Sequence, residues 1–290
     1  MKQEEKALSI LIPTYNSCCV EQVKRLLALC LPCVSAFEII VADDGSADPT
    51  QNQPINDLPH CSFIIKEKNE GSAATRNFLA RQSQFEWLLF LDSDVSILHD
   101  NFISKYLLCD SQADVINGGV AVGGFHPDNL RWKYEKQAEP AHRDNGRQAR
   151  PYHGFRSTNF LIRREVILRV PFDERFKGSG YEDVFFGKAL EQAQVKVCHI
   201  DNPVTMTSYE ENGPFMTKTE HNIQTLHRFR QELQGYSDLI TWSNRLVPKA
   251  LWIGLFSMAQ ASLRKHLCGP HPRLFLYNVY RLGYYLSIKA

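Results

Sequence analysis

The chain has 290 residues, of which 43% are apolar and 22% charged, with a formal net charge of +1. This is the composition of a globular protein that can bury a sizeable core, so it excludes disordered and fibrous chains. The first six residues are polar, and no apolar run is as long as a membrane span. We therefore expect neither a signal peptide nor a spanning helix, and a cytoplasmic protein.

Apolar runs and helical patterns alternate in the first half of the chain. This rhythm predicts an α/β fold with a mostly parallel, doubly wound sheet in one domain. Ser72 is a plausible N-cap for the helix that follows Gly71. The expected strands cover residues 8–14, 37–43, 62–66, 86–92 and 114–120, and the expected helices cover 20–31, 71–82 and 99–109.

The pattern lapses over residues 122–155, which are polar and predict a long functional loop. Beyond it, strands are expected at 158–162 and 195–200, and helices at 181–192 and 215–233. No linker separates these parts, so residues 1–235 are expected to form one domain. Residues 236–290 are expected to form a C-terminal helical appendage.

The eight cysteines fit the expected compartment as unpaired thiols. Cys30-Leu31-Pro32-Cys33 has the spacing of a redox or zinc pair, but it closes a helical pattern instead of opening a helix. The adjacent Cys18 and Cys19 do not supply the second pair that a zinc site needs. We interpret these cysteines as inert.

An apolar run that ends in two carboxylates, Asp92 and Asp94, is the most informative part of the sequence. Leu88 to Leu91 are all apolar, as in a strand covered on both faces. Ligands of open α/β sheets bind at the carboxyl ends of such strands. Asp92 and Asp94 therefore have the position and the chemistry to reach one hard cation.

Seven short sequence blocks, one of which contains Asp92 and Asp94, follow one another along the chain. The seven blocks are Pro13-Thr14-Tyr15-Asn16, Val41-Ala42-Asp43-Asp44-Gly45-Ser46, Asn69-Glu70-Gly71 with Arg76-Asn77, Leu91-Asp92-Ser93-Asp94, Asn159-Phe160-Leu161-Ile162-Arg163-Arg164, Phe172-Asp173-Glu174-Arg175-Phe176 and Gly180-Tyr181-Glu182-Asp183. In this order they resemble the nucleotide-sugar half of family 2 glycosyltransferases. The resemblance implies the GT-A fold and transfer of a sugar with inversion of the anomeric configuration.

The resemblance assigns the first two blocks to the nucleotide. Tyr15, next to Thr14, has an aromatic face that would stack on the base. Asp43 or Asp44 would accept the imide N–H of uracil, while the other holds the backbone of its own turn. Which of the two contacts the base stays open.

Phosphate and metal binding are implied for the next blocks. Arg76 would hold a diphosphate oxygen or pin the carboxylates of Asp92 and Asp94. Asp92 and Ser93 would contact the nucleotide, and Asp94, with Asp92, would bind a divalent cation. Carboxylates that share a cation with phosphate favour Mn²⁺ or Mg²⁺.

The acid pair Glu182 and Asp183 begins a predicted helix. An inverting transfer needs a carboxylate that takes the proton of the acceptor hydroxyl. In the family the second acid of this pair is usually the base, which implies Asp183. Acids are also common in a first helical turn without any catalytic role.

One position departs from the family pattern. Many relatives have a histidine two residues after an Asn-Pro-Val, where it completes the metal shell, but this chain has Met206 there. A thioether is a poor ligand for a hard cation. Either Asp94, diphosphate and water hold the metal, or His199 substitutes from nearby; a core or surface histidine is the simpler interpretation of His199.

The C-terminal residues 237–290 carry seven Lys or Arg against a single acid, Asp238, and are rich in Trp, Tyr and Phe. Basic and aromatic residues together are typical of helices that lie on an anionic membrane. They would also fit nucleic-acid binding, but no recognised module is present, so no nucleic-acid partner is expected. Packing of the helices of this tail on the rest of the chain or in a dimer is the alternative to a membrane contact.

The sequence thus predicts a metal-dependent, inverting hexosyl- or N-acetylhexosaminyl-transferase. Its expected partners are a nucleotide-sugar donor, UDP-linked, and a saccharide or lipid-linked acceptor at the inner face of the membrane. A degenerate, non-catalytic nucleotide-binding or scaffold protein is one alternative. A sugar-phosphate nucleotidyltransferase is another, although no Gly-rich phosphate loop follows the first strand.

Overall fold

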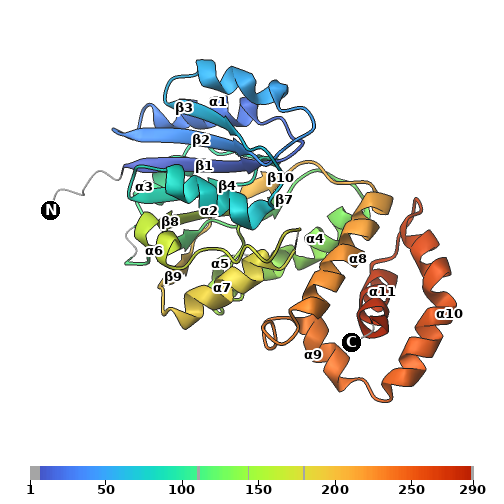
Figure 1. Cartoon of the computed structure of the whole chain (residues 1–290). Coiled ribbons are helices and arrows are strands. Elements are labelled where there is room, and N and C mark those ends of the chain that lie inside the picture. The colour runs from blue at the N-terminus through green and yellow to red at the C-terminus, as the bar shows by residue number, and fades with distance from the viewer. Residues whose placement is uncertain (1–6, 110–111, 143, 179, 289–290) are drawn as a thin grey trace. The chain divides into compact units, whose positions relative to one another are not determined.

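The computed structural model describes residues 7–109, 112–142, 144–178 and 180–288 (Figure 1). The six N-terminal residues that were examined for a signal peptide, and Lys289 of the basic tail, lie outside this range. The chain divides into two compact units. Unit 1 comprises residues 1–123, 140–177 and 182–207, and unit 2 comprises 124–139, 178–181 and 208–290.

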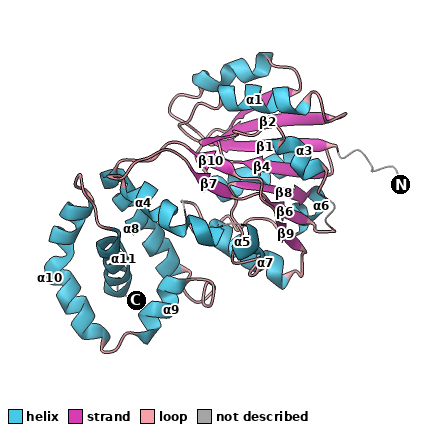
Figure 2. Cartoon of the chain, turned by 180° about the vertical axis from the view of Figure 1, so that it is seen from behind, coloured by secondary structure: helices cyan, strands magenta, loops and turns pink. Residues whose placement is uncertain are grey.

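A seven-stranded sheet forms the centre of unit 1 (Figure 2). Its order is β3-β2-β1-β4-β8-β6-β9, and four of its six strand pairs are parallel, because only β8 runs against its two neighbours. The mostly parallel sheet predicted from the sequence is therefore confirmed. The strands are β1 (Leu8–Thr14), β2 (Phe37–Asp43), β3 (Cys61–Ile65), β4 (Trp87–Leu91), β6 (Val115–Asn117), β8 (Asn159–Arg163) and β9 (Val197–His199).

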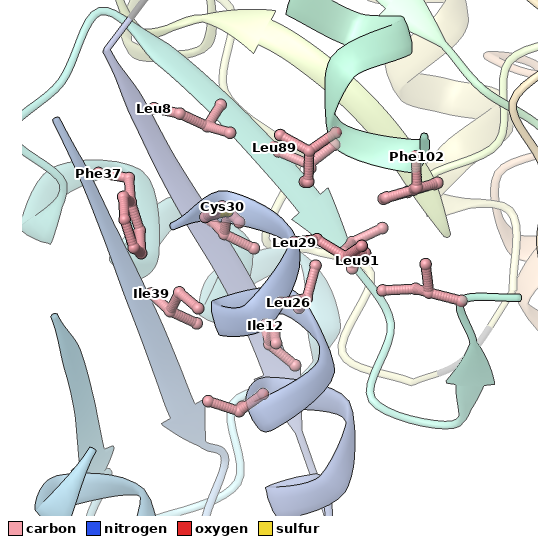
Figure 3. Close-up of a cluster of buried hydrophobic side chains, with 14 of the residues drawn as sticks. Leu8, Ile12, Leu26, Leu29, Cys30, Phe37, Ile39, Leu89, Leu91 and Phe102 are labelled. Atoms are coloured by element: carbon pink, nitrogen blue, oxygen red, sulfur yellow. The ribbon is translucent and has the colours of Figure 1, made fainter. Parts of the chain in front are cut away.

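Helices cover both faces of this sheet because its central strands are apolar on both sides. In β4, Leu89 and Leu91 point into one core and Leu88 and Phe90 into the other, as expected for alternating side chains. Figure 3 shows the first core. The first core receives side chains from α1 (Val20–Cys30), η1 (Thr50–Asp57) and α3 (Phe102–Leu107), and the second from α2 (Ser72–Gln82), α6 (Arg164–Arg169) and α7 (Glu182–Gln192).

The strand expected at residues 114–120 is wrong, because two glycines divide it. β6 ends at Asn117, and β7 (Val120–Val122) joins a separate three-stranded sheet with β5 (Val95–Ser96) and β10 (Val204–Met206). A Cβ at Gly118 would lie 2.2 Å from the hydroxyl oxygen of Tyr106, and Gly119 has a φ of +87°. Only glycine accommodates both conditions, so the chain leaves the first sheet at this point.

The long loop expected at residues 122–155 is also wrong. The structure has α4 (Leu130–Ala138), the short 3₁₀ helix η2 (Glu139–His142) and α5 (Asp144–Gln148) there. The side chain of Asn129 caps α4 by accepting a hydrogen bond from the Trp132 backbone N–H at 2.9 Å. Ser72 in turn is no N-cap, because Gly71 holds that position and Ser72 is the first residue of α2.

Unit 2 is helical. Its core contains Leu130 from α4 together with Met216, Phe256 and Tyr280, which lie far apart in the sequence. The helix α8, expected within a domain ending at residue 235, therefore groups with the tail helices, because its apolar side chains pack against them. The other helices are α8 (Asn212–Arg228), α9 (Asp238–Arg245), α10 (Lys249–Leu267) and α11 (Leu274–Ser287).

Among the described residues, no single helix has the length and hydropathy of a membrane span. The pair α9 and α10 meets the length and composition criteria together, but it is bent by 114° at the break between the two helices.

Candidate active site

Hydrogen bonds connect the loop after β1 to the turn after β2. Asn16 adopts a φ of +50°, its backbone N–H donates to the Ser46 hydroxyl at 2.6 Å, and its side chain accepts from the Ala47 N–H at 3.1 Å. Thr14 is buried, and its hydroxyl donates to the Ser17 carbonyl. Tyr15 keeps 52% of its surface exposed. Of this block, therefore, it is the Tyr15 ring that offers a free aromatic face.

Asp43 and Asp44 are both buried, but they hold different parts of the chain. Asp43 accepts the backbone N–H and the hydroxyl of Ser46 at 2.7 and 2.6 Å, which makes it the residue that fixes its own turn. Asp44 accepts from the Lys66 ammonium at 2.7 Å and from the backbone N–H groups of Glu70 and Gly71 at 3.0 and 2.8 Å. Asp44 thereby fixes the start of α2.

Arg76 connects the Asp92 segment to the Glu182 segment. Its side chain is only 4% exposed; Nη2 lies 2.7 Å from an Asp92 carboxylate oxygen, and Nη1 lies 3.7 Å from Glu182 Oε1. Neither Nε nor Nη1 of this guanidinium has a hydrogen-bond partner among the described residues. A buried cation with two unused donors beside the end of a parallel strand is suited to an anionic group.

The metal-binding prediction concerns Asp94, which is exposed, and Asp92, which is about one-quarter exposed. Asp94 directly precedes β5, and Val95 pairs with Met206 across the small sheet. Met206 therefore lies where a side chain from β10 would approach the Asp94 segment. No group of three or more His, Cys, Asp or Glu residues that could hold a metal occurs in the described part of the chain. The residues present therefore fit a cation that carboxylate and phosphate oxygens hold jointly, without a protein cage.

His199 does not serve as the substitute ligand. It is buried, its Nε2–H donates to the Pro151 carbonyl at 2.8 Å, and its Nδ1 lies 3.0 Å from Arg147 Nη1. Burial, together with the charge of Arg147, lowers the His199 pKa to about 4, so the ring is neutral and Nδ1 accepts from Arg147. Both ring nitrogens are engaged, which confirms the interpretation of a core histidine.

Glu182 and Asp183 begin α7 in different environments. Glu182 is 12% exposed at its side chain and accepts a hydrogen bond from the Ser72 hydroxyl at 3.2 Å. Burial raises its pKa above the ordinary value, the negative charge of Asp183 raises it further, and Arg76 acts in the opposite direction. Asp183 is half-buried and accepts the Val184 backbone N–H at 2.8 Å.

Sequence analysis missed several side chains that support this site. Gln22 of α1 donates to the Asp92 carbonyl at 2.8 Å, and Ser72 links α2 to α7. Asn77 bonds both the backbone N–H and the carbonyl of Phe172, which ties α2 to the loop after α6. Asn77 belongs to one of the seven blocks that resemble the family, so it could have been predicted as a residue that supports the site. Gln22 gave no signal, because one polar residue on an amphipathic helix is ordinary.

Comparison with known proteins identifies the group to which this arrangement belongs. The model of the family described as "Glycosyl transferase family 2" matches residues 9–170, more than half of the chain. The chain belongs to glycosyl transferase family 2. The matched region runs from β1 past β8 and includes the Asp43, Arg76 and Asp92 segments.

Curated members of family 2 resemble this chain over parts of their length. Validoxylamine A glucosyltransferase of Streptomyces hygroscopicus subsp. jinggangensis (strain 5008) is 26% identical over 76% of this chain. The chain spans 58% of that relative, and 29% of an uncharacterized glycosyltransferase of Haemophilus influenzae, to which it is 40% identical over 88 residues. It thus corresponds to less than two thirds of each of these proteins.

Solved structures share the fold. The mannosyltransferase PcManGT from Pyrobaculum calidifontis, in complex with GDP-Man and Mn²⁺, superposes with a TM-score of 0.60 at 14% identity, covering 97% of this chain and 85% of that one. S. aureus TarS 1-349 in complex with UDP-GlcNAc gives a TM-score of 0.51 at 17% identity, covering 97% and 90%. The GT-A fold predicted from the sequence is confirmed.

Proposed function

We propose that this family 2 chain is a metal-dependent, inverting glycosyltransferase that moves a sugar from a UDP-linked donor to a hydroxyl group. The observation that carries the proposal is the position of Arg76. One buried guanidinium joins Asp92, at the nucleotide end of β4, to Glu182, beside the proposed base. The residues that would bind the donor phosphate and the residue that would accept the proton of the acceptor hydroxyl then lie in one site of unit 1.

The nucleotide contacts follow from the two joined loops. Tyr15 offers its exposed ring for stacking on the base. A carboxylate has about four lone-pair positions. Asp43 uses two of its own and Asp44 three, so Asp43 is the better candidate for the imide N–H. Two structural neighbours were solved in complex with GDP-Man and with UDP-GlcNAc, which supports a nucleotide-sugar donor.

For the metal, we propose that Asp94 and Asp92 hold Mn²⁺ or Mg²⁺ together with the diphosphate. The exposure of Asp94 at the end of the strand and the Mn²⁺ in two structural neighbours support this assignment. A cation there offsets the charge that grows on the leaving diphosphate. Arg76, through its two unused donors, would share that charge.

Asp183 is the proposed general base. Burial raises the pKa of Glu182, and its carboxyl group is already engaged by the Ser72 hydroxyl and lies near Arg76, which leaves Asp183 as the acid for the acceptor proton. The acceptor hydroxyl then attacks the anomeric carbon, its proton passes to Asp183, and the bond to the diphosphate breaks on the opposite side. Replacement of Asp183 by Asn is expected to lower kcat by about 10²- to 10⁴-fold with UDP affinity unchanged, whereas Glu182→Gln retains transfer. If Asp183→Asn still transferred sugar at the unaltered rate, Asp183 would not be the general base.

The decisive experiment is isothermal titration of the protein with UDP and with GDP, each with and without Mn²⁺. We expect UDP binding that depends on Mn²⁺ and that Asp94→Ala abolishes. Asp100→Ala is the matched control, because Asp100 is a highly exposed carboxylate a few residues further along the chain and its ion pair among the described residues is with Arg25. Binding of GDP in preference to UDP would overturn the choice of donor.

A second function, nucleotide binding without turnover, is favoured by one observation. Met206 occupies the place of a third metal ligand, and the described residues supply no other. UDP binding without any transfer or donor hydrolysis in the presence of Mn²⁺ would support this alternative. Absence of binding by either nucleotide, with the protein folded, would contradict both functions.

The proposal extends to the donor sugar and the place of the reaction. We propose a hexosyl or N-acetylhexosaminyl donor, because the similar proteins include a glucosyltransferase, a mannosyltransferase and a protein that binds UDP-GlcNAc. A saccharide or lipid-linked acceptor on the cytoplasmic side of a membrane completes the proposal. Fractionation of cells that express the full chain tests the location.

A further inference from the structure

One face of α10 is apolar and exposed to solvent. Leu251, Leu255 and Met258 are 57%, 53% and 86% exposed, and they follow one another at the spacing that places side chains on the same side of a helix. Trp252, 46% exposed, widens this stripe on one side. Isolated exposed apolar residues are ordinary, but a contiguous stripe of large ones marks an interaction surface.

The opposite face of α10 is fixed to the protein. Phe256 is 6% exposed and Leu267 is fully buried. Gly283 of α11 makes room for the Phe256 ring, since a Cβ at this glycine would lie 2.2 Å from Phe256 Cδ2. Within unit 2, α11 contacts both α10 and α8, and Figure 1 shows it between them. The stripe therefore faces outward on a supported helix.

Large apolar side chains are also exposed in α9 and in the connection that follows it. Trp242 is 58% exposed and Val247 is 81% exposed. The guanidinium of Arg245 lies over the Trp242 ring, 5.6 Å from its centroid. An exposed indole with a cation beside it is typical of side chains placed at the boundary between apolar and charged lipid regions.

The charges of α9 and α10 are almost all positive. Asp238, the exposed first residue of α9, is their single acid, and residues 239–288 contain no Asp or Glu. Four basic side chains of this range are exposed: Arg245, Lys249, Lys265 and Arg273. A second copy of the chain bound through the same face would bring its own cations against these, which disfavours self-association. A lipid bilayer with anionic headgroups would bury the apolar stripe in its interior and would bind the exposed cationic side chains at its surface.

We propose that α9 and α10 form a membrane-docking surface that inserts its apolar stripe at the level of the headgroups of anionic lipids. The stripe contacts the acyl boundary, and Arg245 and Lys249 contact headgroup phosphates. The proposal concerns only unit 2 and does not depend on the transfer reaction. It names the class of surface, an anionic bilayer, that would bring the chain to a lipid-linked acceptor.

The test is co-sedimentation of the full chain with vesicles of phosphatidylcholine alone or mixed with equal parts of phosphatidylglycerol. Binding is expected to the anionic vesicles and to weaken with salt. The double variant Leu255→Ser/Met258→Ser should lower the partition coefficient by about tenfold or more, because it removes two large apolar groups from the interface. Arg245→Glu/Lys249→Glu should lose the preference for anionic lipid.

A matched control is Leu98→Ser/Leu108→Ser, since these leucines are 61% and 65% exposed in unit 1. This control should bind vesicles like the unaltered chain. All variants change exposed side chains, and thermal melting checks that each is folded. Equal binding of Leu255→Ser/Met258→Ser and the unaltered chain would overturn the proposal. So would a dimer, detected by light scattering, that dissociates in the same variant.

Discussion

Replacement of Asp44 by Asn tests the role that the structure gives to this carboxylate. Asp44 and Lys66 form a buried ion pair, with side chains 6% and 8% exposed and a separation of 2.7 Å. The Asn side chain is neutral, so the Lys66 ammonium would keep only Glu70, at 3.1 Å and partly exposed, as a charged partner. Breaking a buried pair at one end costs about 3–5 kcal/mol. We expect about 3 kcal/mol for Asp44→Asn, because Glu70 remains.

The measurement is urea unfolding at pH 7, followed by circular dichroism. Asp43→Asn is the control, because the Asp43 carboxylate hydrogen-bonds to Ser46 and pairs with no cation among the described residues. Combining Asp44→Asn with Lys66→Met should recover part of the loss, since no unpaired charge then stays buried. A loss below about 1 kcal/mol for Asp44→Asn would refute the argument, because breaking a buried pair costs several times that amount. If UDP affinity fell sharply at the same time, Asp44 would be the residue that contacts the base.

Three further predictions follow from the described contacts. Because burial lowers the His199 pKa to about 4, the neutral ring stabilises the folded state fully above its unfolded pKa of about 6.5. This stability is lost as the pH falls toward 4, by about 3 kcal/mol in all. In His199→Asn the unfolding free energy, measured between pH 7 and 4, should therefore depend less on pH. Burial raises the Cys30 pKa to about 12, so iodoacetamide at pH 7.5 should modify the exposed Cys18 and spare Cys30, as mass spectrometry of peptides would detect. Met206→His should raise Mn²⁺ affinity in the presence of UDP by about tenfold, as measured by titration; an unchanged affinity would mean that β10 does not approach the metal.

The strands and the residues at their ends could be predicted from sequence because apolar runs and polar termini are local signals. β1, β2 and α2 agree with expectation to within a residue. Arg76 pairs with Asp92, which is one of the two contacts that the sequence offered for it, and its position near Glu182 was not expected. The Asp43-Asp44 dipeptide does not show which of the two aspartates fixes the turn. Their roles differ because Lys66 and the Gly71 backbone bind Asp44, and only the folded chain brings these groups near it.

The errors have equally physical causes. The break at Gly118 depends on the Tyr106 hydroxyl, which a sequence pattern does not place. α4 was missed because its polar residues show no apolar period and its Asn129 cap is one weak signal. The grouping of α8 with the later helices was not expected, because its apolar side chains, Phe215 and Met216, pack on residues that come much later in the chain.

The interleaving of the two units has a consequence for synthesis. The chain passes from one unit to the other at five places, after residues 123, 139, 177, 181 and 207. Leu130 emerges from the ribosome early, yet its partner Tyr280 is made 150 residues later. Unit 2 therefore cannot complete its core until α11 has been synthesised. Until then Leu130, Phe215 and Met216 lack the core partners that α10 and α11 supply, so apolar surface stays uncovered during synthesis.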